Sequence, residues 1–159
     1  DPANVRSSES VQQAFKSINR NSATFISRGD DSGTHKMEVK LWDLSNFNPE
    51  DFGDWYKSVG SGMGASLNIS ASIGAYILSD RASWLNFKNK SDLEILFSDD
   101  KLLLNQYSFI PINPIRHDHV ESKLAEELEN WLTSDTAKSL INGYEIGGQA
   151  LFKLNAKQE

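Results

Sequence analysis

The residues of this chain best suited to chemistry lie in the segment 27–34, Ser-Arg-Gly-Asp-Asp-Ser-Gly-Thr. The apolar stretch 24–26 before it predicts a strand, and the apolar spacing after it predicts a helix from about Thr34 to Leu44. The N–H groups at a helix start have no partner within the helix, and the helix dipole favours negative charge there. Arg28 suits a tetrahedral oxyanion, because its planar guanidinium donates parallel hydrogen bonds. The candidate anion-binding residues are therefore Ser27, Arg28, Ser32, Gly33 and Thr34.

The same segment also fits a helix start that binds no ligand. Asp31 and Ser32 are both good N-cap residues, and Arg28 is close enough in sequence to pair with Asp30. The spacing is neither that of a Walker phosphate loop nor that of a GxGxxG dinucleotide site. Spacing alone leaves the capped helix and the anion site open as alternatives.

A second glycine-rich turn lies at 60–64, before a helix expected at 65–73. This turn also fits a flexible connector. Two loops that each enter a helix converge on one ligand when they follow neighbouring parallel strands, because ligands bind outside the carboxyl ends of such strands. The further candidate ligand-binding residues are Gly64, Ala65 and Ser66.

The composition excludes several classes of protein and of site. The 159 residues suffice for one domain with a core, and the hydrophobic fraction of 38% favours a folded chain. The net charge of −6 argues against a general binder of nucleic acid or of anionic membranes. The absence of cysteine excludes disulfides, thiolate metal sites and cysteine catalysis. No apolar run approaches the roughly 20 residues needed to span a membrane.

Hydrophobic periodicity predicts an alternation of helices and strands. The expected helices span 7–19, 34–44, 65–73, 80–87, 120–132 and 135–142, and the expected strands span 24–26, 75–78 and 93–97. Residues 1–6 are expected to be a linker, and Asp99 and Asp100 a solvated turn. His117 and His119 are expected on the surface, since their spacing is poor for metal ligands. Aromatic residues between 47 and 56 are expected to be core.

The segment Ser27–His35 resembles the signature of the tungstate-binding periplasmic proteins of ABC importers, in the type II periplasmic-binding-protein superfamily. Supporting motifs follow in that family's order: Leu41-Trp42, Trp55-Tyr56, Gly62-Met-Gly64, Ala75–Arg81, Asn105-Gln-Tyr107, Ile112-Asn-Pro114, Trp131-Leu132 and Gly148–Phe152. The resemblance implies an α/β fold, a three-layer α-β-α lobe with a mixed sheet flanked by helices. Residues 1–114 resemble the second lobe, and 115–159 a helical segment that packs against this lobe or against a first lobe absent from the chain.

The resemblance also implies a function. The chain is expected to be a fragment of an extracytoplasmic protein that captures tungstate or molybdate in the periplasm, or outside the cell, for an ABC permease. It implies no enzyme activity, no nucleic-acid partner and no cofactor, since the metal lies within the bound oxyanion. Half of the hydroxyl donors belong to the first lobe, so weak binding by the chain alone is expected.

The sequence leaves three alternatives open. One is a phosphoester-processing enzyme that uses Arg28 and Thr34 on its substrate, with Asp30 or His35 as base. A second is an oxyanion-sensing α/β domain without a transport role. The third is an interaction module, since the apolar surface left by a missing lobe favours homo-oligomers.

Overall fold

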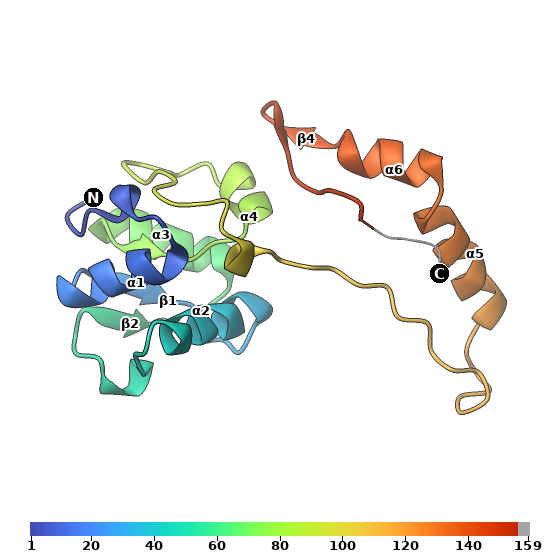
Figure 1. Ribbon diagram of the computed structural model, residues 1–159, viewed down its shortest axis with the longest axis horizontal. Helices are drawn as coiled ribbons and strands as arrows, with labels where there is room; N and C mark the ends of the chain where they lie inside the picture. The colour runs from blue at the N-terminus through green and yellow to red at the C-terminus, as the bar shows by residue number, and fades with distance from the viewer. Residues whose placement is uncertain (156–159) are drawn as a thin grey trace. The chain divides into compact units, whose positions relative to one another are not determined.

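The first of two units, Asp1–Asn105, is built on three short parallel strands in a computed structural model that describes residues 1–155 (Figure 1). The strands are β1 (Phe25–Ser27), β2 (Tyr56–Ser58) and β3 (Tyr76–Ile77), in the order β2-β1-β3. Phe25 is in register with Tyr56 on one side and with Tyr76 on the other. Because all three strands run in the same direction, their carboxyl ends lie at one edge of the sheet.

Each parallel strand leads into a helix: β1 into α2 (Gly33–Leu44), β2 into α3 (Met63–Ile73) and β3 into α4 (Arg81–Asn86). A further helix, α1 (Val11–Arg20), precedes β1, and its predicted apolar face is buried. Single turns of 3₁₀ helix occur at Val5–Ser7, Pro49–Asp51 and Lys101–Leu103. The α/β lobe with helices flanking a sheet is confirmed, and the sheet of this unit is parallel in the described residues.

The core of the first unit is centred on Trp42 of α2, whose exposed fraction is 0%. The ring of Trp42 lies 4.4 Å from that of Phe15, 4.9 Å from Phe52 and 5.3 Å from Phe25, measured between centroids. Edge-to-face pairs of this kind add to the free energy gained from burial. The aromatic residues between 47 and 56 are partly buried and pack against this core, which agrees with their prediction as core residues.

The amino-terminal residues pack into this unit, so the prediction of a linker at 1–6 is wrong. Ala3 and Val5 are buried. The Asp1 carboxylate accepts hydrogen bonds from the Val5 N–H (2.9 Å) and from the Tyr76 hydroxyl (2.7 Å). The segment is thereby attached to β3.

Two further predictions from local pattern are wrong. Residues 93–97 form no strand; instead Leu96 and Phe97 pack their side chains against the core. Asp100 is not a freely solvated turn residue, because its carboxylate accepts from the N–H groups of Val11 (2.9 Å) and Leu102 (2.9 Å). Those two N–H groups hold the pKa of Asp100 below its usual value.

The second unit begins at Gln106 and contains α5 (Ser122–Leu132), α6 (Asp135–Asn142) and the hairpin of β4 (Glu145–Ile146) and β5 (Gln149–Ala150). Both helices lie close to their predicted ranges. Ala137 is the only buried residue in the described part of this unit, 106–155. The apolar side chains of the second unit are therefore largely exposed, including Leu124 (59%), Leu128 (45%) and Trp131 (44%).

Candidate functional site

The candidate site lies at the carboxyl edge of the sheet, where the loop from β1 to α2 meets the loop from β2 to α3. The Val59 N–H donates to the Ser27 carbonyl and the Ser61 N–H to the Arg28 carbonyl, both at 3.0 Å. Gly29 has a φ of +60°, and a Cβ atom there would lie 1.9 Å from the Ser58 Oγ. A glycine is therefore required at Gly29, both by its backbone conformation and by the close approach of the second loop.

The first loop orients Arg28 through Asp30. The Arg28 Nη2 donates to Asp30 Oδ2 at 2.5 Å, and the Ser32 N–H donates to Asp30 Oδ1 at 3.3 Å. The pKa of Asp30 is lowered to about 2, chiefly by the Ser32 hydroxyl and also by Arg28. Asp30 is therefore a carboxylate at neutral pH. The ion pair that the capped-helix alternative expected is present.

Arg28 keeps hydrogen-bonding capacity beyond this ion pair. Its side chain is only 16% exposed. Its Nε is buried and has no hydrogen-bond partner in the described residues. A buried guanidinium N–H without an acceptor is costly, so an acceptor brought by a ligand would stabilise it.

At the start of α2, some backbone N–H groups are hydrogen-bonded within the protein and others are not. The Ser32 N–H bonds to Asp30, and the Ser32 Oγ caps the helix by accepting from the His35 N–H (3.3 Å). The N–H groups of Gly33 and Thr34 make no hydrogen bond within residues 1–155. These two amides of the first helical turn are therefore available to an anion.

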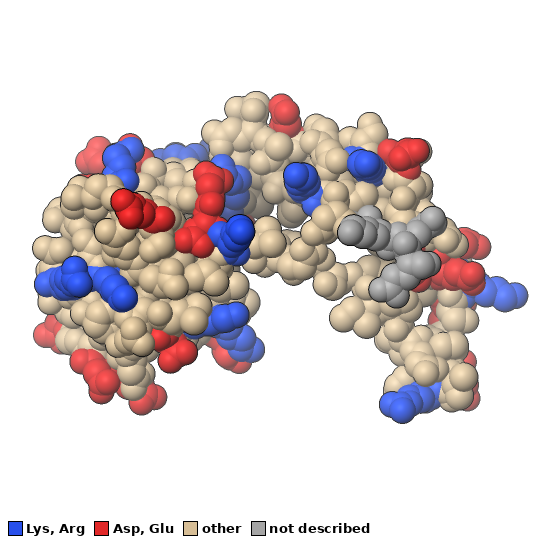
Figure 2. Space-filling model, viewed as in Figure 1, with Lys and Arg blue, Asp and Glu red and all other residues tan. Residues whose placement is uncertain are grey.

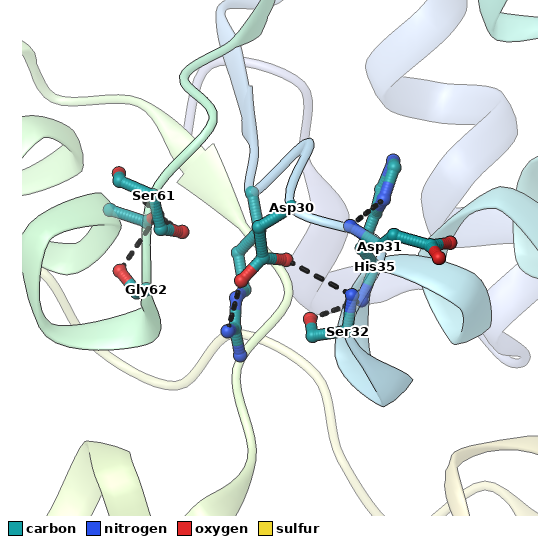
Figure 3. A network of polar contacts seen from close by, with 8 residues as sticks. Asp30, Asp31, Ser32, His35, Ser61 and Gly62 are labelled. Carbon is teal, nitrogen blue, oxygen red and sulfur yellow. Dashed lines mark hydrogen bonds and ion pairs between the residues drawn. The ribbon is translucent and has the colours of Figure 1, made fainter.

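The start of α3 offers a second set of amides. Its N-cap residue is Gly62, which provides no side-chain hydrogen bond, and Gly64 and Ala65 of the first turn are exposed. Figure 3 shows the carboxylate of Asp30 between the turn at Ser61 and Gly62 and the start of α2 at Ser32. In this view the turn before α3 and the start of α2 thus lie on either side of Asp30.

Two of the predicted ligand-binding serines instead point into the protein. The buried Ser66 hydroxyl lies 3.1 Å from the carbonyl oxygens of Ser61 and of Gly62. Ser27 is 0% exposed. Its Oγ makes no hydrogen bond within the described residues. Both hydroxyls are therefore turned away from the exterior, and Ser66 stabilises the turn before α3.

Glu38 is the polar residue near the site that sequence reasoning missed. It is 2% exposed on α2, and this burial raises its pKa. The signal was available, because Glu38 precedes Leu41 and Trp42 by three and four residues and so shares their buried helical face.

The described residues contain no group of three or more histidine, aspartate or glutamate side chains placed to hold a metal ion. Within the same residues, no helix is long and apolar enough to cross a membrane. On the face in Figure 2, acidic and basic side chains are interspersed over the first unit.

Comparisons with known proteins give a consistent set of similarities. Residues 1–136 match a family model described as PBP superfamily domain. The chain is 39% identical over 164 residues to a putative ABC transporter anion-binding protein of Haloferax volcanii, covering 100% of this chain and 47% of that protein. It is 42% identical over 145 residues to the tungstate-binding protein TupA of Peptoclostridium acidaminophilum, covering 90% and 50%. The chain thus spans about half the length of these curated relatives.

Solved structures show the same relationship. The tungstate-binding protein TupA of Desulfovibrio alaskensis matches with a TM-score of 0.88 and 38% identity, over 99% of this chain and 64% of that one. The tungstate ABC transporter structure from Geobacter sulfurreducens matches with a TM-score of 0.72 and 33% identity, over 91% and 60%.

Proposed function

We infer that this chain, which belongs to the PBP superfamily, is one lobe and the carboxyl-terminal part of an extracytoplasmic solute-binding protein. We propose that the whole protein captures tungstate, or the similar oxyanion molybdate, for import by an ABC permease. The support from relatives is that proteins with 38% and 42% identity are named for tungstate binding. Periplasmic or extracellular location is part of the same proposal.

The observation that carries the proposal is the convergence of unpaired N–H groups on one place. The amides of Gly33 and Thr34 begin α2, α3 follows the neighbouring strand β2, and the Arg28 carbonyl accepts from the Ser61 N–H of the loop before α3. Helix starts attract anions, and a guanidinium adds a full positive charge. We propose Arg28, Ser32, Gly33 and Thr34 as ligand-binding residues, with the Gly64 and Ala65 amides as the second set.

The local charges favour binding over catalysis. A general base must take up a proton near the working pH, and a carboxyl group with a pKa of about 2 is unsuited to this. Both oxygens of Asp30 are already engaged by Arg28 and Ser32. Asp30 therefore serves to orient Arg28, which supports an oxyanion-binding role over phosphoester processing.

We propose that the second unit packs against the amino-terminal lobe of the whole protein. The support is the exposure of Leu124, Leu128 and Trp131 on α5, an apolar face that ordinarily requires a partner. Light scattering tests this against the alternative of homo-oligomers. If the isolated chain self-associates and the full-length protein is a monomer, the second unit packs against the amino-terminal lobe. If both are dimers, the chain is a dimerising module.

Isothermal titration of the full-length protein with tungstate tests the binding site. The variant Arg28→Gln should lose about tenfold to a hundredfold in affinity, because a hydrogen bond to a charged group contributes roughly 1.5–3 kcal/mol. Arg20→Gln, which removes an exposed arginine at the end of α1, is the matched control and should bind as the wild type does. Equal affinity of the two variants would contradict the site.

The same titration with this chain alone tests the two-lobed arrangement. The chain supplies only part of the donors around the anion, and so it should bind tungstate far more weakly than the full-length protein does. Nanomolar binding by the isolated chain would show that the site is complete within one lobe.

A further inference from the structure

A buried carboxyl group lies on α2 about one helical turn beyond the candidate anion site. Glu38 is 2% exposed, and its Oε1 accepts two hydrogen bonds, from the Trp42 Nε1 at 3.0 Å and from the Tyr56 hydroxyl at 2.7 Å. Trp42 belongs to α2 and Tyr56 to β2, so this one oxygen connects the helix after β1 to the neighbouring strand. A buried carboxyl group is costly unless it is hydrogen-bonded, so Trp42 and Tyr56 are what stabilise Glu38 in this position.

The cluster reaches the site through Ser27, the last residue of β1. Ser27 Oγ lies beside Glu38 and Tyr56, and Arg28 follows it in the chain. Glu38 is also four and five residues beyond the free amides of Thr34 and Gly33. At 1.5 Å per helical residue, this places its Cα about 6–8 Å along the axis from the proposed ligand donors.

The groups that face Glu38 come from three elements. Tyr56 from β2 and Ser27 from β1 contribute hydroxyls. The His35 ring from α2 acts electrostatically to lower the pKa of Glu38, against the larger effect of burial. Helix α1, which packs against α2, buries apolar side chains. The described residues therefore give Glu38 no lysine or arginine as an ion-pair partner.

We propose that Glu38 is a positioning residue of the oxyanion site, which holds α2 against β2 through its hydrogen bond from Tyr56 and favours ligand binding in its protonated form. The inference rests on the proposed function, because it concerns the same site. Its physical reason is charge: a protonated Glu38 keeps its acceptor oxygen for Trp42 and Tyr56 but adds no negative charge near a bound dianion.

The sign of the resulting pH dependence follows from linkage. A dianion near Glu38 raises the cost of ionising this carboxyl group, so binding of the dianion raises its pKa and takes up protons. Burial already raises the pKa of Glu38 in the free protein. Tungstate affinity should therefore be highest at low pH and fall as pH rises through the pKa of Glu38, by tenfold for each unit by which the ligand shifts that pKa.

The decisive variant is Glu38→Gln in the full-length protein, with tungstate and molybdate as probes. Glutamine keeps an oxygen that accepts from Trp42 and Tyr56, but it carries no charge at any pH. The variant should bind with the low-pH affinity of the wild type and should lack the decline from Glu38. The His35 ring also acts electrostatically on Glu38. The same titrations on His35→Asn separate the two contributions, because this variant should retain the decline due to Glu38.

A second variant tests positioning without the charge. Tyr56→Phe removes one hydrogen bond to Glu38 and keeps the ring in the aromatic core, and it should weaken tungstate binding severalfold at low pH, where Glu38 is protonated in both proteins. The proposal is overturned if Glu38→Gln retains the wild-type pH profile, or if Tyr56→Phe binds as the wild type does. If the wild type binds neither oxyanion, the proposed function fails first and this inference fails with it.

Discussion

The close approach of the two loops at Gly29 leads to a prediction that separates backbone strain from steric overlap. Replacing Gly29 by alanine forces a side chain into a left-handed conformation, with φ of +60°, which costs about 1–2 kcal/mol. The new Cβ would also lie 1.9 Å from the Ser58 Oγ. Ser58 must then leave its rotamer, or the loop must shift, which costs about 1 kcal/mol more.

Gly60 provides the matched control for this variant. It has the same φ of +60°, but a Cβ there would have no heavy atom within 4 Å. Gly60→Ala should therefore lose only the free energy of unfolding that the left-handed backbone conformation costs. Urea unfolding followed by tryptophan fluorescence measures both, and Gly29→Ala should be the less stable by about 1 kcal/mol.

A third variant identifies the clashing atom. Adding Ser58→Ala to Gly29→Ala removes the Oγ and should bring the free energy of unfolding close to that of Gly60→Ala, whereas Ser58→Ala alone should be nearly neutral because Ser58 is exposed. Equal losses for Gly29→Ala and Gly60→Ala, or no recovery in the double variant, would refute the argument that Gly29 is required by the neighbouring loop.

Three further predictions concern the first unit. Trp42→Ala should lower the free energy of unfolding by about 3–5 kcal/mol in urea titrations, because Trp42 is fully buried at the centre of the core. Asp100→Asn should cost about 1 kcal/mol at neutral pH, since Asp100 accepts from Val11 and Leu102. Because the pKa of Asp100 is lowered on folding, that difference should vanish as pH falls through it in acid titrations. Glu38 has a raised pKa, so its contribution has the opposite sign: wild-type stability should fall as pH rises through that pKa, and Glu38→Gln should lack this slope.

The features predicted correctly from the sequence are those that depend on neighbouring residues. Helix α1 buries the apolar face expected from its period, and α2 begins at the predicted Ser32 cap. Serine caps bond to an amide three residues away, and apolar helical faces repeat every three to four residues. A short window of sequence therefore contains the information for such elements.

The features that were missed depend on partners far along the chain. Strand β2 at Tyr56–Ser58 was not predicted, since three residues carry little pattern and the strand exists through pairing with β1. Asp100 caps the start of α1 at Val11, which lies 89 residues away in the chain. The apolar run 93–97 satisfies strand periodicity, but it packs against the core without forming a ladder.

The sequence by itself determined the chemistry on offer: a guanidinium, small hydroxyl residues and glycines at a strand-to-helix junction, in an acidic chain without cysteine. Tertiary structure decided which of these groups face outward. Ser27 and Ser66 turn inward, Asp30 takes one donor of Arg28, and the amides of Gly33 and Thr34 remain open. The physical reason is that a side chain's type is a local property, whereas its direction and its unused hydrogen-bonding capacity depend on the strands and helices packed around it.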